Sequence, residues 1–294
     1  MFGLRTRFHY AQCAGCGTLW LMDPPPDLGT YYPKNYYSFA TGGNRARQLV
    51  TGFLCARRDR SYYGHGGVLG RALARLYPEG SLISVARLNV GWEARILDVG
   101  CGGGNLLRRM AAIGYKNLAG VDPLLPNDIS TGEGPRVRRD RLEALTDEKY
   151  DLVMFHHSLE HMGDPKTALR AAARLLPPGG RCLVRLPVVA HAWEKYGTNW
   201  VQLDPPRHIW LPTEGAMRTL AESAGLSVER VEYDSTDYQF WGSELNTRDV
   251  PVGVNPRNLA RLFRKAEIAR FRERAAALNR DGRGDQAVFR LIAN

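Results

Sequence analysis

The sequence predicts an α/β fold in which a mostly parallel sheet carries helices on both faces. From residue 94 onward, short apolar runs alternate with helical stretches, which is the order of βαβ units. A glycine-rich turn follows the first of these runs, at residues 100–104. The chain has 294 residues, of which 44% are hydrophobic and 24% charged. These proportions exclude a disordered, collagen-like or coiled-coil chain, and the length suffices for a sizeable core.

The elements of this sheet are predicted from apolar runs and from signals at their ends. The first strand ends at the glycine turn, and the second ends at Asp122-Pro123. Thr213 precedes Glu214 as a helix cap, and Gly225 ends that helix. The expected strands are 95–99, 118–121, 136–138, 150–155, 181–186, 228–232 and 286–293, and the expected helices are 105–113, 166–176 and 213–224.

The N-terminal part of the chain differs in character. Residues 1–64 are rich in aromatic residues, Gly and Pro, with little helical periodicity, whereas residues 68–88 are spaced for an amphipathic helix broken near Pro78. The expected regions are 1–64 (Cys-x-x-Cys and aromatic residues), 65–90 (helical connector) and 91–294 (main domain, with a substrate loop at 187–212 and a basic helix insertion at 256–282).

The charge is uneven along the chain. The formal net charge is +10: residues 1–90 carry 11 Lys+Arg against 4 Asp+Glu, and residues 256–294 carry 10 against 4. Such basic ends favour an anionic partner, such as nucleic acid, a phosphate-bearing substrate or an acidic membrane surface, or they are a solvated surface rich in Arg. The basic stretch 258–279 reads as an amphipathic helix, which packs on its own protein or contacts a membrane surface.

Several classes of protein are excluded. No apolar run reaches the roughly 18 residues of a membrane-spanning helix, and the first ten residues lack the apolar core of a secretory signal. The five Cys, at positions 13, 16, 55, 101 and 182, form no disulfide framework in a chain this long. We therefore expect a reducing, cytoplasmic setting.

The glycine turn carries the most functional information. Such a turn lets backbone N–H groups approach a ligand closely. A dinucleotide-binding pattern would start at Gly100 and Gly102 but meets Asn105 where its third Gly belongs. Asp98, just before the glycines, suits a cationic ligand and opposes a pyrophosphate. Asp122, at the end of the next strand, is placed to accept hydrogen bonds from ribose hydroxyls. Together they indicate an adenosine-type ligand without phosphates near the helix start.

At this point the sequence resembles class I S-adenosylmethionine-dependent methyltransferases. Asp98-Val-Gly-Cys-Gly-Gly-Gly-Asn is similar to their first motif, and three later segments fit in order: Lys149-Tyr-Asp-Leu-Val-Met-Phe-His-His-Ser-Leu-Glu-His-Met, Leu175-Leu-Pro-Pro-Gly-Gly-Arg-Cys-Leu-Val and Gly284-Asp-Gln-Ala-Val-Phe-Arg-Leu. The resemblance implies a Rossmann-like sheet of seven strands, mostly parallel with an antiparallel last strand, helices on both faces and a small N-terminal extension. It also implies S-adenosyl-L-methionine as cofactor.

A narrower resemblance concerns the acceptor. Residues 13–20, 31–38, 204–210 and 233–244 are similar to bacterial methyltransferases encoded with surface-polysaccharide and modified-sugar genes. Those relatives usually carry a further Cys-x-x-Cys pair upstream, and the residues ahead of Cys13 contain none. The resemblance implies methyl transfer to a small-molecule or glycan acceptor, a sugar hydroxyl in particular.

The same resemblance assigns the cofactor site. The glycine turn should wrap the methionyl part, Asp122 should hold the ribose, and the adenine should lie near residues 140–142. The expected cofactor-binding residues are Asp98, Gly100, Cys101, Gly102, Gly104, Asp122, Pro123, Asp140, Leu142, His156 and His157.

Two clusters raise the question of a metal. Cys13 and Cys16 form half of a zinc site, and only His9 and the distant Cys55 could complete it, so we expect no stoichiometric zinc. The segment 156–161 holds three His and Glu160 at the end of a strand, where ligands bind in open α/β sheets. This spacing suggests a metal but also fits packing around the cofactor; we expect His156 and His157 to contact the cofactor, and no metal.

The long connection 187–212 is predicted to bind the acceptor. A connection of this length without structure of its own is usually a lid or binding loop. Its aromatic residues Trp193 and Tyr196 suit a sugar ring, and Arg207 suits a phosphate; the alternative is aromatic packing over the sheet. His208 is the first choice as general base and His161 the second, because imidazole titrates near neutral pH.

Two other functions stay open. An RNA methyltransferase would suit the basic charge, but no RNA-binding module and no Asn/Asp-Pro-Pro-Tyr signature is present. A protein that binds the cofactor without catalysis would need an occluded or empty acceptor pocket.

Overall fold

The computed structural model describes residues 6–32, 45–130, 134–252, 259 and 261–294. Its centre is a sheet with the strand order β10-β11-β8-β7-β3-β4-β6-β5. The strands are β3 Arg95–Val99, β4 Asn117–Val121, β5 Ile129–Ser130, β6 Arg136–Arg138, β7 Leu152–His156, β8 Arg181–Pro187, β10 Leu226–Tyr233 and β11 Gln286–Ala293.

This sheet confirms the predicted fold class. The five strands β6, β4, β3, β7 and β8 run parallel, and the last strand, β11, is antiparallel to both β8 and β10. The two-residue strand β5, which pairs antiparallel with β6, is an addition at the edge.

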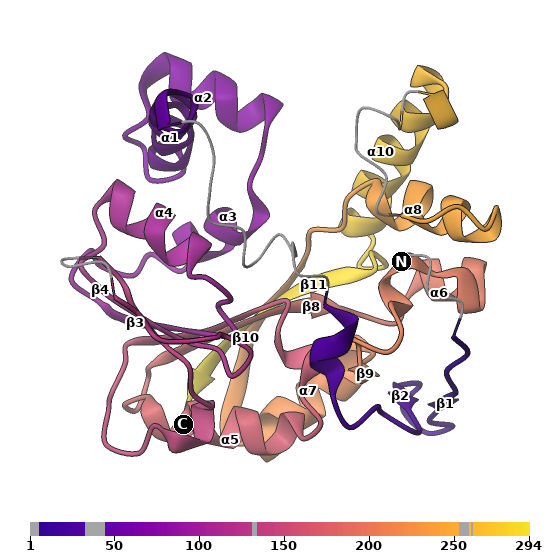
Figure 1. Ribbon diagram of the computed structural model, residues 1–294, viewed down its shortest axis with the longest axis horizontal. Helices are drawn as coiled ribbons and strands as arrows, with labels where there is room; N and C mark the ends of the chain where they lie inside the picture. The colour runs from indigo at the N-terminus through magenta and orange to yellow at the C-terminus, as the bar shows by residue number, and fades with distance from the viewer. Residues whose placement is uncertain (1–5, 33–44, 131–133, 253–258, 260) are drawn as a thin grey trace.

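Helices cover both faces of the sheet (Figure 1). Neighbouring residues of a strand point to opposite faces: Ile96 of β3 packs with α3 Gly80–Ala86 and α4 Asn105–Ile113, whereas Leu97 packs with α5 Pro165–Leu175 and α7 Glu214–Ser223. Ile96 and Leu97 are both fully buried, and burial of each side chain stabilises the fold by about 1.5–3 kcal/mol relative to leaving it exposed.

Two helices stand beyond α3 and α4, α1 Arg45–Ser61 and α2 Gly67–Leu76. The absence of helical periodicity before residue 64 was therefore misleading, because α1 is fixed by charge as well as by apolar contacts. Asp59 of α1 is buried and accepts hydrogen bonds from Arg58 and Arg109 at 2.9–3.0 Å. The broken helix expected over 68–88 is confirmed as α2 and α3.

The helices α8 Tyr238–Thr247 and α10 Lys265–Arg280 pack together at the other side of the molecule. The basic helix expected over 258–279 is interrupted: the described residues 259, 261 and 262 are helical, residues 263 and 264 are not, and α10 follows. The Glu267 side chain accepts a hydrogen bond from the Arg264 N–H at 2.7 Å, which caps α10 and starts it at Lys265. Residues 253–258 and 260 of the expected insertion lie outside the described residues.

A second, small sheet joins the N-terminal region to the segment 187–212. It has the order β1-β2-β9, with β1 Tyr10–Gln12, β2 Leu19–Leu21 and β9 Trp210–Leu211. The segment 187–212 thus has structure of its own, which corrects the expectation of a long loop; besides β9 it contains α6 His191–Tyr196, η4 Gly197–Asn199 and η5 Val201–Leu203. No helix of the described residues is long and apolar enough to cross a membrane.

Candidate functional site

A cavity of about 940 Å³ opens at the carboxyl ends of β3, β4 and β7. Its walls come from the glycine turn, from the ends of these strands and from the N-terminal segment 24–32, which includes η1 Leu28–Tyr31. Open α/β sheets bind their ligands at this edge. All the residues predicted to bind the cofactor line the cavity except Gly104.

The glycine turn adopts a backbone that side chains resist. Gly100, Gly102 and Gly104 have φ angles of 71°, 52° and 74°. A Cβ on Gly100 would lie 2.4 Å from the Cβ of Ser158, and Ser158 is held because its hydroxyl donates to the Val99 carbonyl at 2.6 Å. Gly104 is the N-cap of α4, faces Val137 and does not line the cavity; that it binds the cofactor stays a prediction.

Asp98 lies at the end of β3, buried at the cavity wall. Burial, and then the nearby Asp122, raise the pKa of its carboxyl group to about 8. No side chain or N–H group of the described residues donates a hydrogen bond to it. A carboxyl group in this state is stabilised as an anion by a cationic ligand in the cavity.

Asp122 lies beside it, at the end of β4. Its two oxygens accept hydrogen bonds from the N–H groups of Gly102 at 2.9 Å and Leu124 at 2.8 Å. Burial raises the pKa of this carboxyl group although both N–H groups lower it. Each oxygen keeps a further lone pair, so the carboxylate is fixed in place and can still accept two hydroxyl donors.

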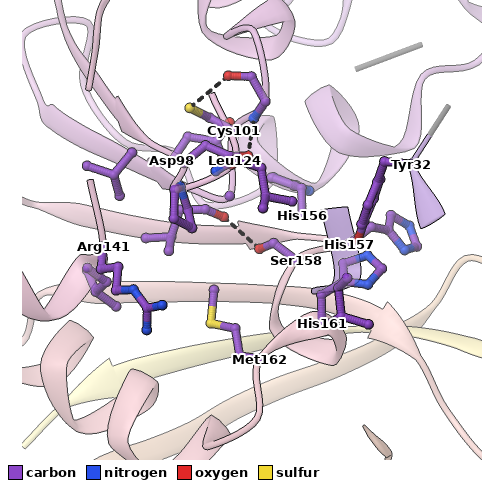
Figure 2. A pocket seen from close by; sticks show the side chains of 18 of the residues that line it. Tyr32, Asp98, Cys101, Leu124, Arg141, His156, His157, Ser158, His161 and Met162 are labelled. Atoms are coloured by element: carbon purple, nitrogen blue, oxygen red, sulfur yellow. Dashed lines mark hydrogen bonds between the residues drawn. The ribbon is translucent and has the colours of Figure 1, made fainter. Parts of the chain in front are cut away.

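Figure 2 shows the two ends of the cavity. Arg141, between the predicted residues Asp140 and Leu142, lies at one end. Tyr32, His157 and His161 lie at the other. Sequence reasoning missed Tyr32 and Ser158; Tyr32 belongs to the aromatic run 31–37, but nothing in that run predicts which residue reaches the cavity.

His156 and His157 differ in their partners. Both ring nitrogens of His156 are buried, and no described residue bonds to either one. His157 is fully engaged: its Nε2 accepts from Arg185 Nη1 at 2.7 Å, so its Nδ1 carries the proton toward Glu160 Oε1 at 3.3 Å. Burial and Arg185 lower the pKa of His157 to about 3. Of the two rings, only that of His156 lines the cavity with both nitrogens unbonded by any described residue.

His161 and His208 form a pair, with ring centres 4.9 Å apart. His161 lines the cavity, whereas His208 is buried behind it. Of the two predicted bases, the second choice, His161, is the one that lines the cavity; which of them acts as a base stays a prediction. Burial lowers the pKa of each to about 4, so both rings are neutral near pH 7.

The other residues predicted to bind the acceptor do not reach the cavity. Trp193 packs against a cluster around the buried Trp200, and the Tyr196 hydroxyl bonds to Glu244 at 3.0 Å. Arg207 pairs with Asp204, and its guanidinium carbon lies 5.6 Å from the centre of the Tyr32 ring. None of these three residues lines the cavity, and their contact with an acceptor stays a prediction.

Cys13 and Cys16 are exposed on the turn between β1 and β2, and the Cys16 thiol donates to Thr18 Oγ1 at 3.2 Å. Hydrogen bonds from Cys16 and Gly15 lower the pKa of Cys13. Within the described ranges no third His, Cys, Asp or Glu completes a metal site with this pair. The expectation that they hold no stoichiometric zinc stays a prediction.

Comparison with known proteins gives one family. The sequence profile of the family described as "Methyltransferase domain" matches residues 66–231, more than half of the chain. Two similar proteins are named "Ubiquinone biosynthesis O-methyltransferase": that of Pseudomonas fluorescens strain Pf0-1 is 36% identical over 105 residues (32% of this chain, 44% of that protein), and that of Xanthomonas oryzae pv. oryzae strain PXO99A is 39% identical over 105 residues (33% and 44%). The chain thus spans less than half the length of these curated relatives.

Among solved structures, a putative sarcosine dimethylglycine methyltransferase from Galdieria sulphuraria is similar with a TM-score of 0.47 and 16% identity, over 81% of this chain and 97% of that one. The cyclopropane synthase MmaA2 from Mycobacterium tuberculosis has a TM-score of 0.47 and 18% identity, over 76% and 84%.

Proposed function

Because this chain belongs to the methyltransferase-domain family, we propose that it transfers the methyl group of S-adenosylmethionine to a hydroxyl group of a small molecule, a sugar hydroxyl in the first instance. The observation that carries the proposal is one cavity with an acidic pair at the glycine turn and a neutral histidine at the end away from Arg141. The word "O-methyltransferase" in the names of the curated relatives supports oxygen as the atom methylated.

The residues at the glycine turn fit S-adenosylmethionine, the cofactor of this family. Asp98 accepts no hydrogen bond within the described chain, so it suits the positively charged amino group of the methionyl part. Asp122 has two lone pairs for the ribose hydroxyls. The unpartnered ring of His156 is a further contact. When bound, the sulfonium group supplies an already activated methyl group, so the protein chiefly has to align the acceptor.

The acceptor end has to remove a proton. A hydroxyl group loses its proton as it is methylated, and His161 is the neutral group that lines this end of the cavity. Its Nδ1 lies 2.8 Å from the Arg207 carbonyl; since a carbonyl oxygen can only accept, Nδ1 carries the proton and Nε2 has the free lone pair. His161, with His208 behind it, is thus the residue that assists removal of the acceptor proton.

The test is methyl transfer from radiolabelled S-adenosylmethionine to a panel of acceptors, namely nucleotide sugars, dihydroxyphenols and RNA. We expect transfer to a small hydroxyl compound and a loss of about 100-fold or more in His161→Ala, with cofactor affinity unchanged. His191→Ala is the control, since His191 lies outside the cavity and bonds to Arg274. Methylation of RNA alone, or cofactor binding without transfer to any acceptor, would favour one of the two alternatives instead.

The ribose contact gives a separate prediction. Asp122→Ala should weaken S-adenosylmethionine binding by about 1.5–3 kcal/mol, because the lost carboxylate leaves two hydroxyl donors unpaired. Calorimetry measures this. Asp128→Ala is the matched control, because Asp128 also accepts from a backbone N–H but does not line the cavity. Equal affinities in the two variants would contradict the ribose assignment.

A further inference from the structure

Three electron-rich side chains meet behind the acceptor end of the cavity. One ligand-type atom from each of Glu160, His161 and His208 lies within 4.8 Å of the other two. In the part of the chain that the structure describes, this is the one group of three or more His, Cys, Asp or Glu side chains arranged so. Glu160 and His161 come from η3 Leu159–His161, and His208 comes from the segment ahead of β9.

The two imidazole rings are oriented alike. Nδ1 of His161 lies 2.8 Å from the Arg207 carbonyl oxygen, and Nδ1 of His208 lies 2.5 Å from that of Gln202. Because carbonyl oxygens only accept, both Nδ1 atoms carry the protons and both Nε2 atoms have free lone pairs. Histidines that bind metals are fixed in this way, by a hydrogen bond from the other ring nitrogen to a backbone carbonyl.

The Glu160 carboxylate is also held by a hydrogen bond at one atom and left unbonded at another. It is fully buried; its Oε1 accepts from His157 Nδ1 at 3.3 Å, while no described residue bonds to its Oε2. His208 Nε2 lies 4.0 Å from Glu160 Oε1 and 4.0 Å from Asp204 Oδ2. The Nε2 atom of His208 thus lies near two carboxylates, and one of them, Asp204, is paired with Arg207. A buried carboxylate in such surroundings is costly unless a cation joins it.

We propose that Glu160, His161 and His208 bind a divalent transition-metal ion, with coordination positions left open toward the cavity. Two imidazoles and one carboxylate suit Zn²⁺, Mn²⁺ or Fe²⁺, whereas Mg²⁺ and Ca²⁺ prefer all-oxygen sites. The role of the ion depends on the proposed function. It lowers the pKa of an acceptor hydroxyl that coordinates it, and that hydroxyl loses its proton to water in the cavity. In that case the Nε2 lone pair of His161 binds the ion, so His161 promotes loss of the acceptor proton through the ion rather than by taking the proton itself.

Metal binding is tested without activity. The purified 294-residue protein is stripped with EDTA, and Co²⁺ alone is then titrated while the visible d–d absorption is recorded. Zn²⁺ serves as the competitor, and elemental analysis gives the stoichiometry. We expect one ion per chain, and at least 100-fold weaker binding in His208→Ala and in Glu160→Gln. Cys16→Ser and His191→Ala should bind as the parent protein does, and circular dichroism shows that each variant is folded.

The outcomes separate the metal from the methyl transfer. The metal site is contradicted if no ion binds, if the folded variants His208→Ala and Glu160→Gln bind the ion with unchanged affinity, or if binding is lost in Cys16→Ser alone. Full turnover by the metal-free protein overturns the role of the ion but leaves the proposed function standing. Stoichiometric binding in a protein that methylates no hydroxyl compound confirms the site and contradicts the proposed function.

Discussion

Asp98→Asn is expected to stabilise the cofactor-free protein above neutral pH and, in the same variant, to remove most of its affinity for S-adenosylmethionine. The carboxyl group has a pKa of about 8 in the folded chain, against 3.8 for an unperturbed aspartate. Between these values the folded state holds a proton that the unfolded state has lost, so stability falls as pH rises through that window. Asparagine cannot ionise and escapes this loss of stability, but it also cannot carry the negative charge that attracts a cationic ligand.

The measurement is the melting temperature of both proteins from pH 5 to pH 9, with calorimetry of cofactor binding at pH 7 in buffers of different ionisation enthalpy. The gap between the melting temperatures should widen as pH rises, and the parent protein should release up to one proton on binding where the variant releases none. Asp128→Asn, remote from the cavity, is the control. Parallel melting curves together with unchanged affinity would show that Asp98 plays neither part.

Gly100→Ala should abolish measurable cofactor binding and destabilise the fold. The φ angle of 71° costs alanine about 1–2 kcal/mol. The new Cβ, 2.4 Å from the Ser158 Cβ, adds about 1–3 kcal/mol of overpacking, and the displaced turn moves the N–H group that Asp122 binds. Cofactor calorimetry and denaturant unfolding measure the two effects.

Two further variants isolate the clash. Gly163→Ala is the matched control, because Gly163 also lines the cavity and has open space where its Cβ would stand. The double variant Gly100→Ala/Ser158→Gly removes the opposing Cβ, so it should recover part of the stability while the cost of the φ angle persists. A Gly100→Ala protein that binds cofactor normally would mean that the turn does not form the cofactor wall.

The end of the cavity that we propose binds the cofactor was predictable because it is local in sequence. A strand, a glycine turn, a helix and the next strand bring Asp98, Gly100 and Asp122 together without reference to the rest of the chain. The end that we propose binds the acceptor is not local: Tyr32, His161 and His208 come from three separated segments. Their meeting depends on tertiary packing that no periodicity in the sequence expresses.

The segment 187–212 shows the limit of composition. Its aromatic residues suit a sugar, but the same residues suit a hydrophobic core, and the partner that decides is far away in the chain. Trp200 is buried because its Nε1 reaches the carboxylate of Asp285, 2.9 Å away. In α1, likewise, the buried Asp59 needs Arg109 of α4, so this helix could not be predicted from an apolar stripe.

The small sheet β1-β2-β9 joins the N-terminal region to the segment that holds His208, so the two segments can be exchanged only together. Leu19 of β2 pairs with Leu211 of β9, and the Tyr10 hydroxyl donates to the His208 carbonyl at 2.6 Å. A chimera that takes residues 1–32 from a relative would place a new β2 beside an unmatched β9. The residue at position 10 would likewise meet a His208 carbonyl to which it is not fitted. Exchange of the N-terminal region, in the laboratory or in evolution, therefore has to carry residues 200–212 along with it.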